Sequence, residues 1–167
     1  IDVASGVTLT AGGLSNASTT FSGVISGDGA FSKAGSGTTT LSGANTFSGE
    51  TSINEGTLLV SGSLSDSTLV DVASGANYKV GSDDTIGGLQ GAGSADLNSN
   101  TLTVNNADTN GSTTFSGVIA GSGSGSSLTK EGSGTLELSG ASTYEGATSL
   151  SAGTLKATGS LANTALS

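Results

Sequence analysis

The residues of this 167-residue chain that could carry out acid–base or metal chemistry are almost all carboxylic acids. The sequence has no His and no Cys, so it lacks the usual nucleophile–base pairs and soft metal ligands. Its only adjacent acidic pair, Asp83–Asp84, is the one candidate for binding a hard cation. A turn in which these carboxylates accept hydrogen bonds from backbone N–H groups is the alternative. We therefore predict no metal site.

The remaining chemical hypothesis is a carbohydrate-binding or carbohydrate-cleaving protein. Two carboxylates about 5–10 Å apart could hydrolyse a glycosidic bond, and stacked segments could bring Asp71 or Asp96 near another acid. Tyr78 has no counterpart elsewhere in the chain and is the candidate exposed aromatic for a sugar. However, the acids are scattered singly and no arginine accompanies them. We predict no catalytic residue, no cofactor and no enzyme, and keep the carbohydrate hypothesis as the alternative.

The charge of the chain excludes two classes of partner. Its net charge is −9, from four lysines and thirteen acids. Binding to nucleic acid or to an anionic membrane surface requires clustered cations, which are missing here. No apolar run is long enough to span a bilayer. We predict neither a nucleic-acid partner nor insertion of this segment into a membrane.

The sequence contains an internal repeat. Thr19–Leu64 aligns with Thr113–Leu161, with a short insertion in the second copy. Lys33 matches Lys130 within this alignment. The other matched positions, which we predict to be structural, are Gly35, Gly37, Leu41, Gly43, Phe47, Gly49, Gly56 and Leu58 in the first copy and Gly132, Gly134, Leu138, Gly140, Tyr144, Gly146, Gly153 and Leu155 in the second. We expect Phe47 and Tyr144 to pack over a corner.

A second repeated segment relates the two ends of the sequence. DVASG occurs at Asp2–Gly6 and at Asp71–Gly75, and the second occurrence follows a GSL segment like the one that ends the second repeat. Residues 1–167 then form a single segment with two related halves, about 1–69 and 70–167. We predict that this segment is one period of a tandem array in which an Ile1-like residue follows Ser167. An arbitrary cut from a longer repetitive protein is the alternative.

Short stretches such as Thr38–Ser42, Thr57–Val60 and Thr135–Ser139 alternate apolar and polar residues, which predicts half-buried strands. Glycine, Asn, Asp and Ser fill the gaps between them, as in turns. Such short strands with so few aromatic residues favour a parallel β-helix, whose coils of about 20 residues stack about 4.8 Å apart. We predict an all-β fold of about seven to eight coils with glycine at the corners. Its inward side chains would include Leu41, Ile53 and Leu58, and its outward ones Thr38, Thr40 and Thr57.

Two stretches carry a family resemblance: GSGTTTLSGANTFSGETSINEGTLLVSG and GSGTLELSGASTYEGATSLSAGTLKATG. They closely resemble the passenger-associated repeat of bacterial autotransporter (type V secreted) passenger domains, although Thr39 stands where Leu136 is more typical. The resemblance implies a right-handed parallel β-helix exported across the outer membrane to the cell surface.

The same resemblance implies a function and a set of partners. Such segments form rigid stalks or fibres of giant surface adhesins, in adhesion, self-association or biofilm-type assembly. The implied partners are neighbouring copies of the repeat, end to end or side by side, and surface glycans or proteins of a host or a bacterium.

Overall fold

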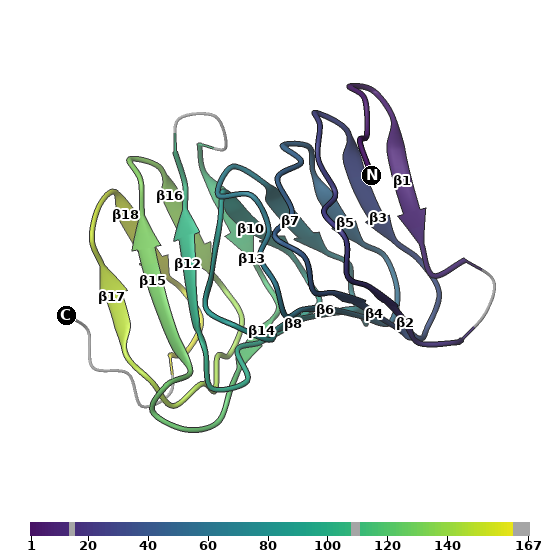
Figure 1. Cartoon of the computed structure of the whole chain (residues 1–167). Helices are drawn as coiled ribbons and strands as arrows, with labels where there is room; N and C mark the ends of the chain where they lie inside the picture. Colours follow the sequence, from purple (N-terminus) through teal and green to yellow (C-terminus); the bar gives the residue numbers. More distant parts are fainter. Residues whose placement is uncertain (14–15, 108–110, 162–167) are drawn as a thin grey trace.

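The computed structural model describes residues 1–13, 16–107 and 111–161, and over these ranges the regular structure is entirely β. The predicted all-β fold is therefore confirmed, and no helix of the described residues could cross a membrane. The strands follow one another in successive turns of the chain (Figure 1). They are β1 (Thr8–Ala11), β2 (Thr19–Phe21), β3 (Ala30–Lys33), β4 (Thr38–Leu41), β5 (Thr51–Ile53), β6 (Thr57–Val60), β7 (Leu69–Val72), β8 (Asn77–Val80), β9 (Asp84–Ile86), β10 (Gly88–Gly91), β11 (Ser94–Asp96), β12 (Thr101–Asn105), β13 (Thr113–Phe115), β14 (Val118–Ala120), β15 (Ser127–Glu131), β16 (Thr135–Leu138), β17 (Thr148–Leu150) and β18 (Thr154–Ala157).

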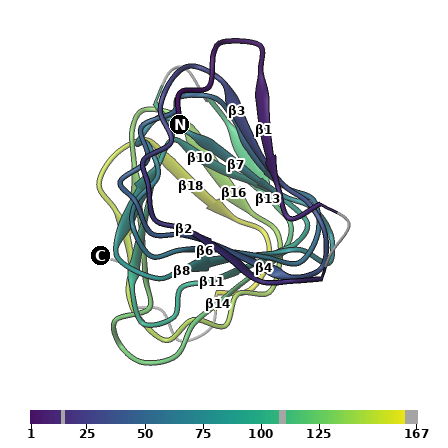
Figure 2. The same cartoon turned by 45° about the vertical axis from the view of Figure 1, so that its right-hand side comes forward.

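These strands form three sheets in which the named strands pair in parallel. The first sheet has eight strands in the order β1-β3-β5-β7-β10-β13-β16-β18, and the second has six in the order β14-β11-β8-β6-β4-β2. The third sheet has four strands, β17-β15-β12-β9. The sheets enclose a three-sided column (Figure 2). Each turn adds one strand to the eight-stranded sheet, so β1 and β18 are about seven turns apart, which confirms the predicted β-solenoid.

The third side of the solenoid continues toward the N-terminus without named strands. Isolated parallel bridges join Asp2 to Ser26 and Ala44 to Ser63. The backbone N–H of Leu64 then donates to the carboxylate of Asp84 at the start of β9, at 3.2 Å to each oxygen. The described coils therefore have three sides. The strand β9 continues the third side, which the isolated bridges already form in the coils nearer the N-terminus.

Alternation along each strand decides which side chains enter the core. In β4 and β6, Leu41 and Leu58 are fully buried, whereas Thr38 and Thr57 are only partly buried. Ile53 is likewise buried in β5. The predicted inward and outward sides of these strands are therefore confirmed. The core is one continuous apolar column, because each inward residue rests on its partner in the next coil.

The prediction of Tyr78 as an exposed aromatic is wrong, because its exposure is 0%. The register of the six-stranded sheet places it between Leu58 of β6 and Ala95 of β11, and both of these point inward. Its hydroxyl donates to Oδ2 of Asp84 at 3.3 Å, so its polar end is satisfied inside the column. No sugar could stack on this ring.

The glycines of the repeat serve two physical purposes. Gly35 and its match Gly132 have φ angles of 71° and 69°, the left-handed region that favours glycine, so the predicted corner role is correct for them. Gly43 and Gly140 do not have positive φ. A Cβ at Gly140 would instead overlap the carbonyl oxygen of Gly117 in the neighbouring coil. Close stacking of coils, as well as turning, therefore requires glycine in this sequence.

Candidate functional site

The two copies of the repeat occupy different sides of the same solenoid. In the first copy, β3 and β5 belong to the eight-stranded sheet, whereas their counterparts β15 and β17 belong to the four-stranded sheet. Likewise, β4 and β6 belong to the six-stranded sheet, whereas β16 and β18 belong to the eight-stranded sheet. The second copy is therefore moved around the axis by one side.

This displacement has a cause in the chain between the copies. The first copy enters on β2 in the six-stranded sheet and the second on β13 in the eight-stranded sheet, so the chain between them does not complete a whole number of turns. Residues that match in sequence consequently face different directions. The two copies cannot form one continuous lateral binding surface from the same residues. What the repeat preserves is the construction of a coil.

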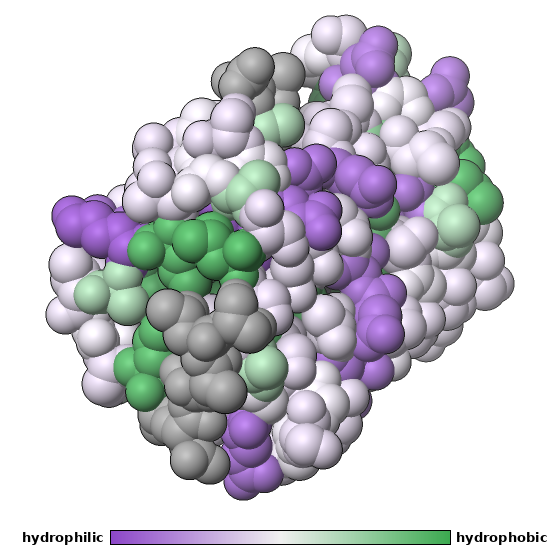
Figure 3. Space-filling model, turned by 90° about the vertical axis from the view of Figure 1, so that its left-hand side faces the viewer, coloured by the Kyte–Doolittle hydropathy of each residue, from purple (hydrophilic) through white to green (hydrophobic). Residues whose placement is uncertain are grey.

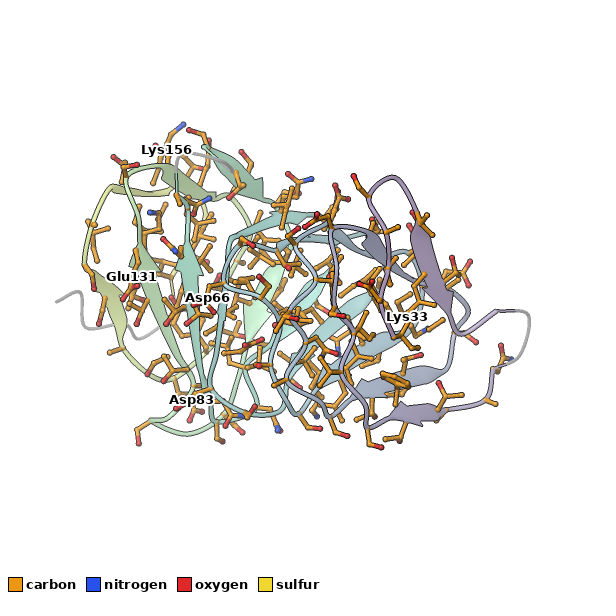
Figure 4. All side chains as sticks on the ribbon, turned by 45° about the horizontal axis from the view of Figure 1, so that its top comes forward. Lys33, Asp66, Asp83, Glu131 and Lys156 are labelled. Carbon is orange, nitrogen blue, oxygen red and sulfur yellow. The ribbon has the colours of Figure 1, made fainter. Side chains whose placement is uncertain are left out.

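Near the start of each matched repeat, a buried lysine binds backbone carbonyls of two coils. The Lys33 side chain is fully buried at the end of β3, and Nζ donates to the carbonyl oxygens of Ala34 at 2.7 Å, Gly35 at 2.5 Å and Glu55 at 3.2 Å. Figure 4 shows Lys33 toward the N-terminal end of the solenoid. The ammonium group thus satisfies carbonyls that a tight corner leaves without N–H partners.

Lys130 repeats this arrangement in the second copy. Its Nζ donates to the carbonyls of Glu131, Gly132 and Ala152, and the side chain is fully buried. Burial lowers the pKa of both lysines, while nearby Glu55 and Glu131, respectively, raise it. The match between Lys33 and Lys130 was visible in the sequence, but this carbonyl-binding role was not predicted. The structure thereby assigns a purpose to two of the four lysines of the chain.

Phe47 and Tyr144 are buried, as predicted for aromatic residues that pack at a corner. The hydroxyl of Tyr144 lies 2.6 Å from Oγ1 of Thr148. In the first copy the matching Thr51 is also buried, but Phe47 offers no hydroxyl and Oγ1 of Thr51 lacks a hydrogen-bond partner. The two copies therefore share their packing and differ in one polar contact. Neither aromatic ring presents a sugar-binding surface.

The candidate cation ligands Asp83 and Asp84 have separate structural roles. Asp84 is buried and accepts from the Leu64 N–H and the Tyr78 hydroxyl, whereas Asp83 accepts from the N–H of Thr101 at 2.8 Å. The two carboxylates hold neighbouring coils together, which agrees with the turn-type explanation. A surface hollow of about 410 Å³ lies beside them and is also lined by Asp66. Within residues 1–13, 16–107 and 111–161, no three potential ligands are grouped closely enough to hold a metal ion.

The other acids considered for carbohydrate chemistry lie elsewhere. Asp96 is in β11 of the six-stranded sheet, 3.4 Å from Nζ of Lys79. Asp71 is in β7 of the eight-stranded sheet and accepts from Nε2 of Gln90 at 2.9 Å. The residues of the carbohydrate hypothesis do not converge on one cleft, and we propose no catalytic role for them.

Asp84 makes the stability of the solenoid depend on pH. Burial raises the pKa of its carboxyl group to about 7, although hydrogen bonds from Leu64 and Tyr78 lower it. A raised carboxyl pKa favours the folded state at low pH, and this contribution is lost as the pH rises through about 7. We expect the free energy of unfolding, obtained from urea denaturation, to fall between pH 5 and about pH 7 by at most about 1.4 kcal/mol per pH unit. In Asp84→Asn, this contribution to the pH dependence of the unfolding free energy should disappear.

The matched control for this prediction is Asp83→Asn, since Asp83 neighbours Asp84 in the chain but bonds a different coil. The pH dependence that Asp84 causes should persist in this variant. An unchanged slope in Asp84→Asn would show that this carboxyl group does not titrate as its burial requires.

The fold and these contacts define a class of protein: a parallel β-solenoid whose repeated residues build its coils. The comparison with known families agrees, because the model of the Passenger-associated-transport-repeat matches at residues 31–60 and 128–157. These two segments are passenger-associated transport repeats, as in autotransporter passengers, and each runs from β3 to β6 or from β15 to β18. The predicted resemblance is thereby confirmed. The searches of curated proteins and of solved structures found no match.

Proposed function

We propose that this chain is a structural segment of an exported cell-surface protein, in which it acts as a stiff β-solenoid stalk. The observation that carries the proposal is the displacement of the second repeat to another side of the solenoid. A lateral site built from the same residues of both copies would require those residues to face the same way, whereas a stalk requires only that each coil stacks on the next. The buried lysines and the stacked glycines both serve that stacking.

The proposal extends to adhesion, self-association or biofilm-type assembly, through the polar sides of the rod. On the four-stranded sheet, Thr85, Thr103, Thr129 and Ser149 form one outward row across β9, β12, β15 and β17. Parallel strands repeat about every 4.8 Å, so two such rows on neighbouring rods could align and exchange many weak hydrogen bonds. We favour this like-with-like contact over recognition of a glycan, since Tyr78 is buried.

The experiment displays one or two tandem copies of the chain on a Gram-negative cell, fused to an autotransporter barrel and carrying an N-terminal tag. Cryo-electron tomography then measures the height of the tag above the outer membrane. We expect the second copy to add a narrow increment of about 38 Å, the length of eight stacked coils. A Gly/Ser linker of equal length should give a broad distribution of heights. A broad distribution for the solenoid would contradict the stalk.

The same cells test the role in assembly. Cells that display the chain should settle faster than cells that display the Gly/Ser linker. Replacing Thr103 and Thr129 by Asp should abolish the difference, because it adds like charges to the row on a chain whose net charge is already −9. Equal settling of all three strains would restrict the function to that of a spacer.

A further inference from the structure

The chain contains, in its own interior, a model for how its two ends fit together. The strand β6 ends the first repeat, and the following DVASG segment leads into β8, which pairs with β6 in parallel. The register pairs Thr57 with Asn77, Leu58 with Tyr78 and Val60 with Val80. A repeat-ending strand and a DVASG-led strand therefore form neighbouring coils.

The same two kinds of strand lie at opposite ends of the solenoid. The strand β18 ends the second repeat and matches β6, while β1 follows the DVASG segment at Asp2–Gly6 and matches β8. Both β18 and β1 belong to the eight-stranded sheet, where they are the two edge strands. Their sequences, TLKA and TLTA, differ at one position. A second copy stacked on β18 would thus continue the same sheet, with Leu155 beside Leu9.

Apolar positions that are buried in the interior are exposed at both ends of the described solenoid. Leu150 in β17 is 41% exposed, whereas its counterpart Ile53 is 1% exposed because β7 covers it. Val7 is 52% exposed, whereas Ala76, in the same position after the second DVASG, is 1% exposed. In the interior, Ile53 and Ala76 have a neighbouring coil on each side. Figure 3 shows the C-terminal end, where apolar patches interrupt the polar surface.

We propose that the end formed by β17 and β18 binds the β1 end of a second copy of this chain, head to tail, through parallel pairing of β18 with β1. The register follows the interior junction and sets Lys156 beside Thr10. Such a heterologous contact does not close on itself, so it yields rods that lengthen by whole chains. The predicted junction at Ser167 lies outside the described residues, and the inference depends on the solenoid alone, not on display at a cell surface.

Cysteine cross-linking tests this proposal, because the sequence contains no cysteine. Thr10→Cys and Lys156→Cys are prepared separately, since both positions are exposed on outward sides of edge strands. Neighbouring parallel strands bring paired Cα atoms within disulfide reach. Mixed and oxidised, the two variants should form a covalent dimer. The doubly substituted chain should form a ladder of dimers, trimers and longer species.

The matched control uses Thr114→Cys in place of the Lys156→Cys variant. Thr114 is an exposed residue of β13, in the middle of the same sheet. Mixed with Thr10→Cys, it should give no dimer above the background of each variant alone. Circular dichroism of each variant verifies that the fold is retained. Equal cross-linking of the two mixtures, or none in either, would overturn the proposal, as would a doubly substituted chain that stays monomeric.

Discussion

Replacing Gly140 by alanine is expected to lower the free energy of unfolding by about 3 kcal/mol. Gly140 lies where the coil of the second repeat passes over the preceding coil, and a Cβ there would overlap the carbonyl oxygen of Gly117. The obstructing atom belongs to the backbone, so the coils must separate and strain the hydrogen bonds on both sides. Urea denaturation followed by circular dichroism measures the loss.

The control is Gly13→Ala, because a Cβ at Gly13 meets no atom within 4 Å. This variant should unfold within about 0.5 kcal/mol of the parent. If Gly140→Ala were as stable as Gly13→Ala, the coils would not stack as closely as the structure places them, and glycine would serve only the corners.

Lys33→Met is the second substitution with a large expected effect. Methionine preserves most of the buried apolar stem, but it removes the donor to the carbonyls of Ala34, Gly35 and Glu55. A buried carbonyl left without a partner costs about 1–3 kcal/mol. Removing an unfavourably buried charge offsets part of this cost, since burial already lowers the pKa of Lys33. We expect a net loss of about 3 kcal/mol in thermal or urea unfolding.

Lys156→Met provides the comparison for Lys33→Met. Lys156 is exposed near the opposite end of the solenoid (Figure 4) and contacts Glu137 at 3.1 Å as a surface ion pair. Its loss should cost less than about 1 kcal/mol. Equal effects of the two substitutions would mean that the buried ammonium group does not hold the corner together.

The sequence predicted the coils because their determinants are local. Alternation in stretches such as Thr57–Val60 identifies both the strand and its inward face, and that prediction holds for Leu58. The matched aromatic residues Phe47 and Tyr144 could be assigned to packing because each coil must bury the same position, and both are buried.

Other features depend on which coil lies beside which, and the sequence does not state this. Tyr78 is buried because the register sets it between Leu58 and Ala95. Asp84 accepts the hydrogen bond of the Tyr78 hydroxyl because the chain bends between β8 and β9, and the composition does not reveal this bend. The change of side between the two repeats depends on the turns completed by the chain between them, and small differences in coil length decide that number.

The most direct test of one continuous solenoid with displaced repeats is an intrachain disulfide between β12 and β15. Thr103 pairs with Thr129 in the four-stranded sheet, and both side chains are outward. The double variant Thr103→Cys, Thr129→Cys should oxidise to a monomeric, cross-linked chain. If the second repeat kept the side of the first, Thr129 would instead lie on the eight-stranded sheet. A disulfide in Gln90→Cys, Thr129→Cys, with none in the first variant, would then contradict the displaced arrangement.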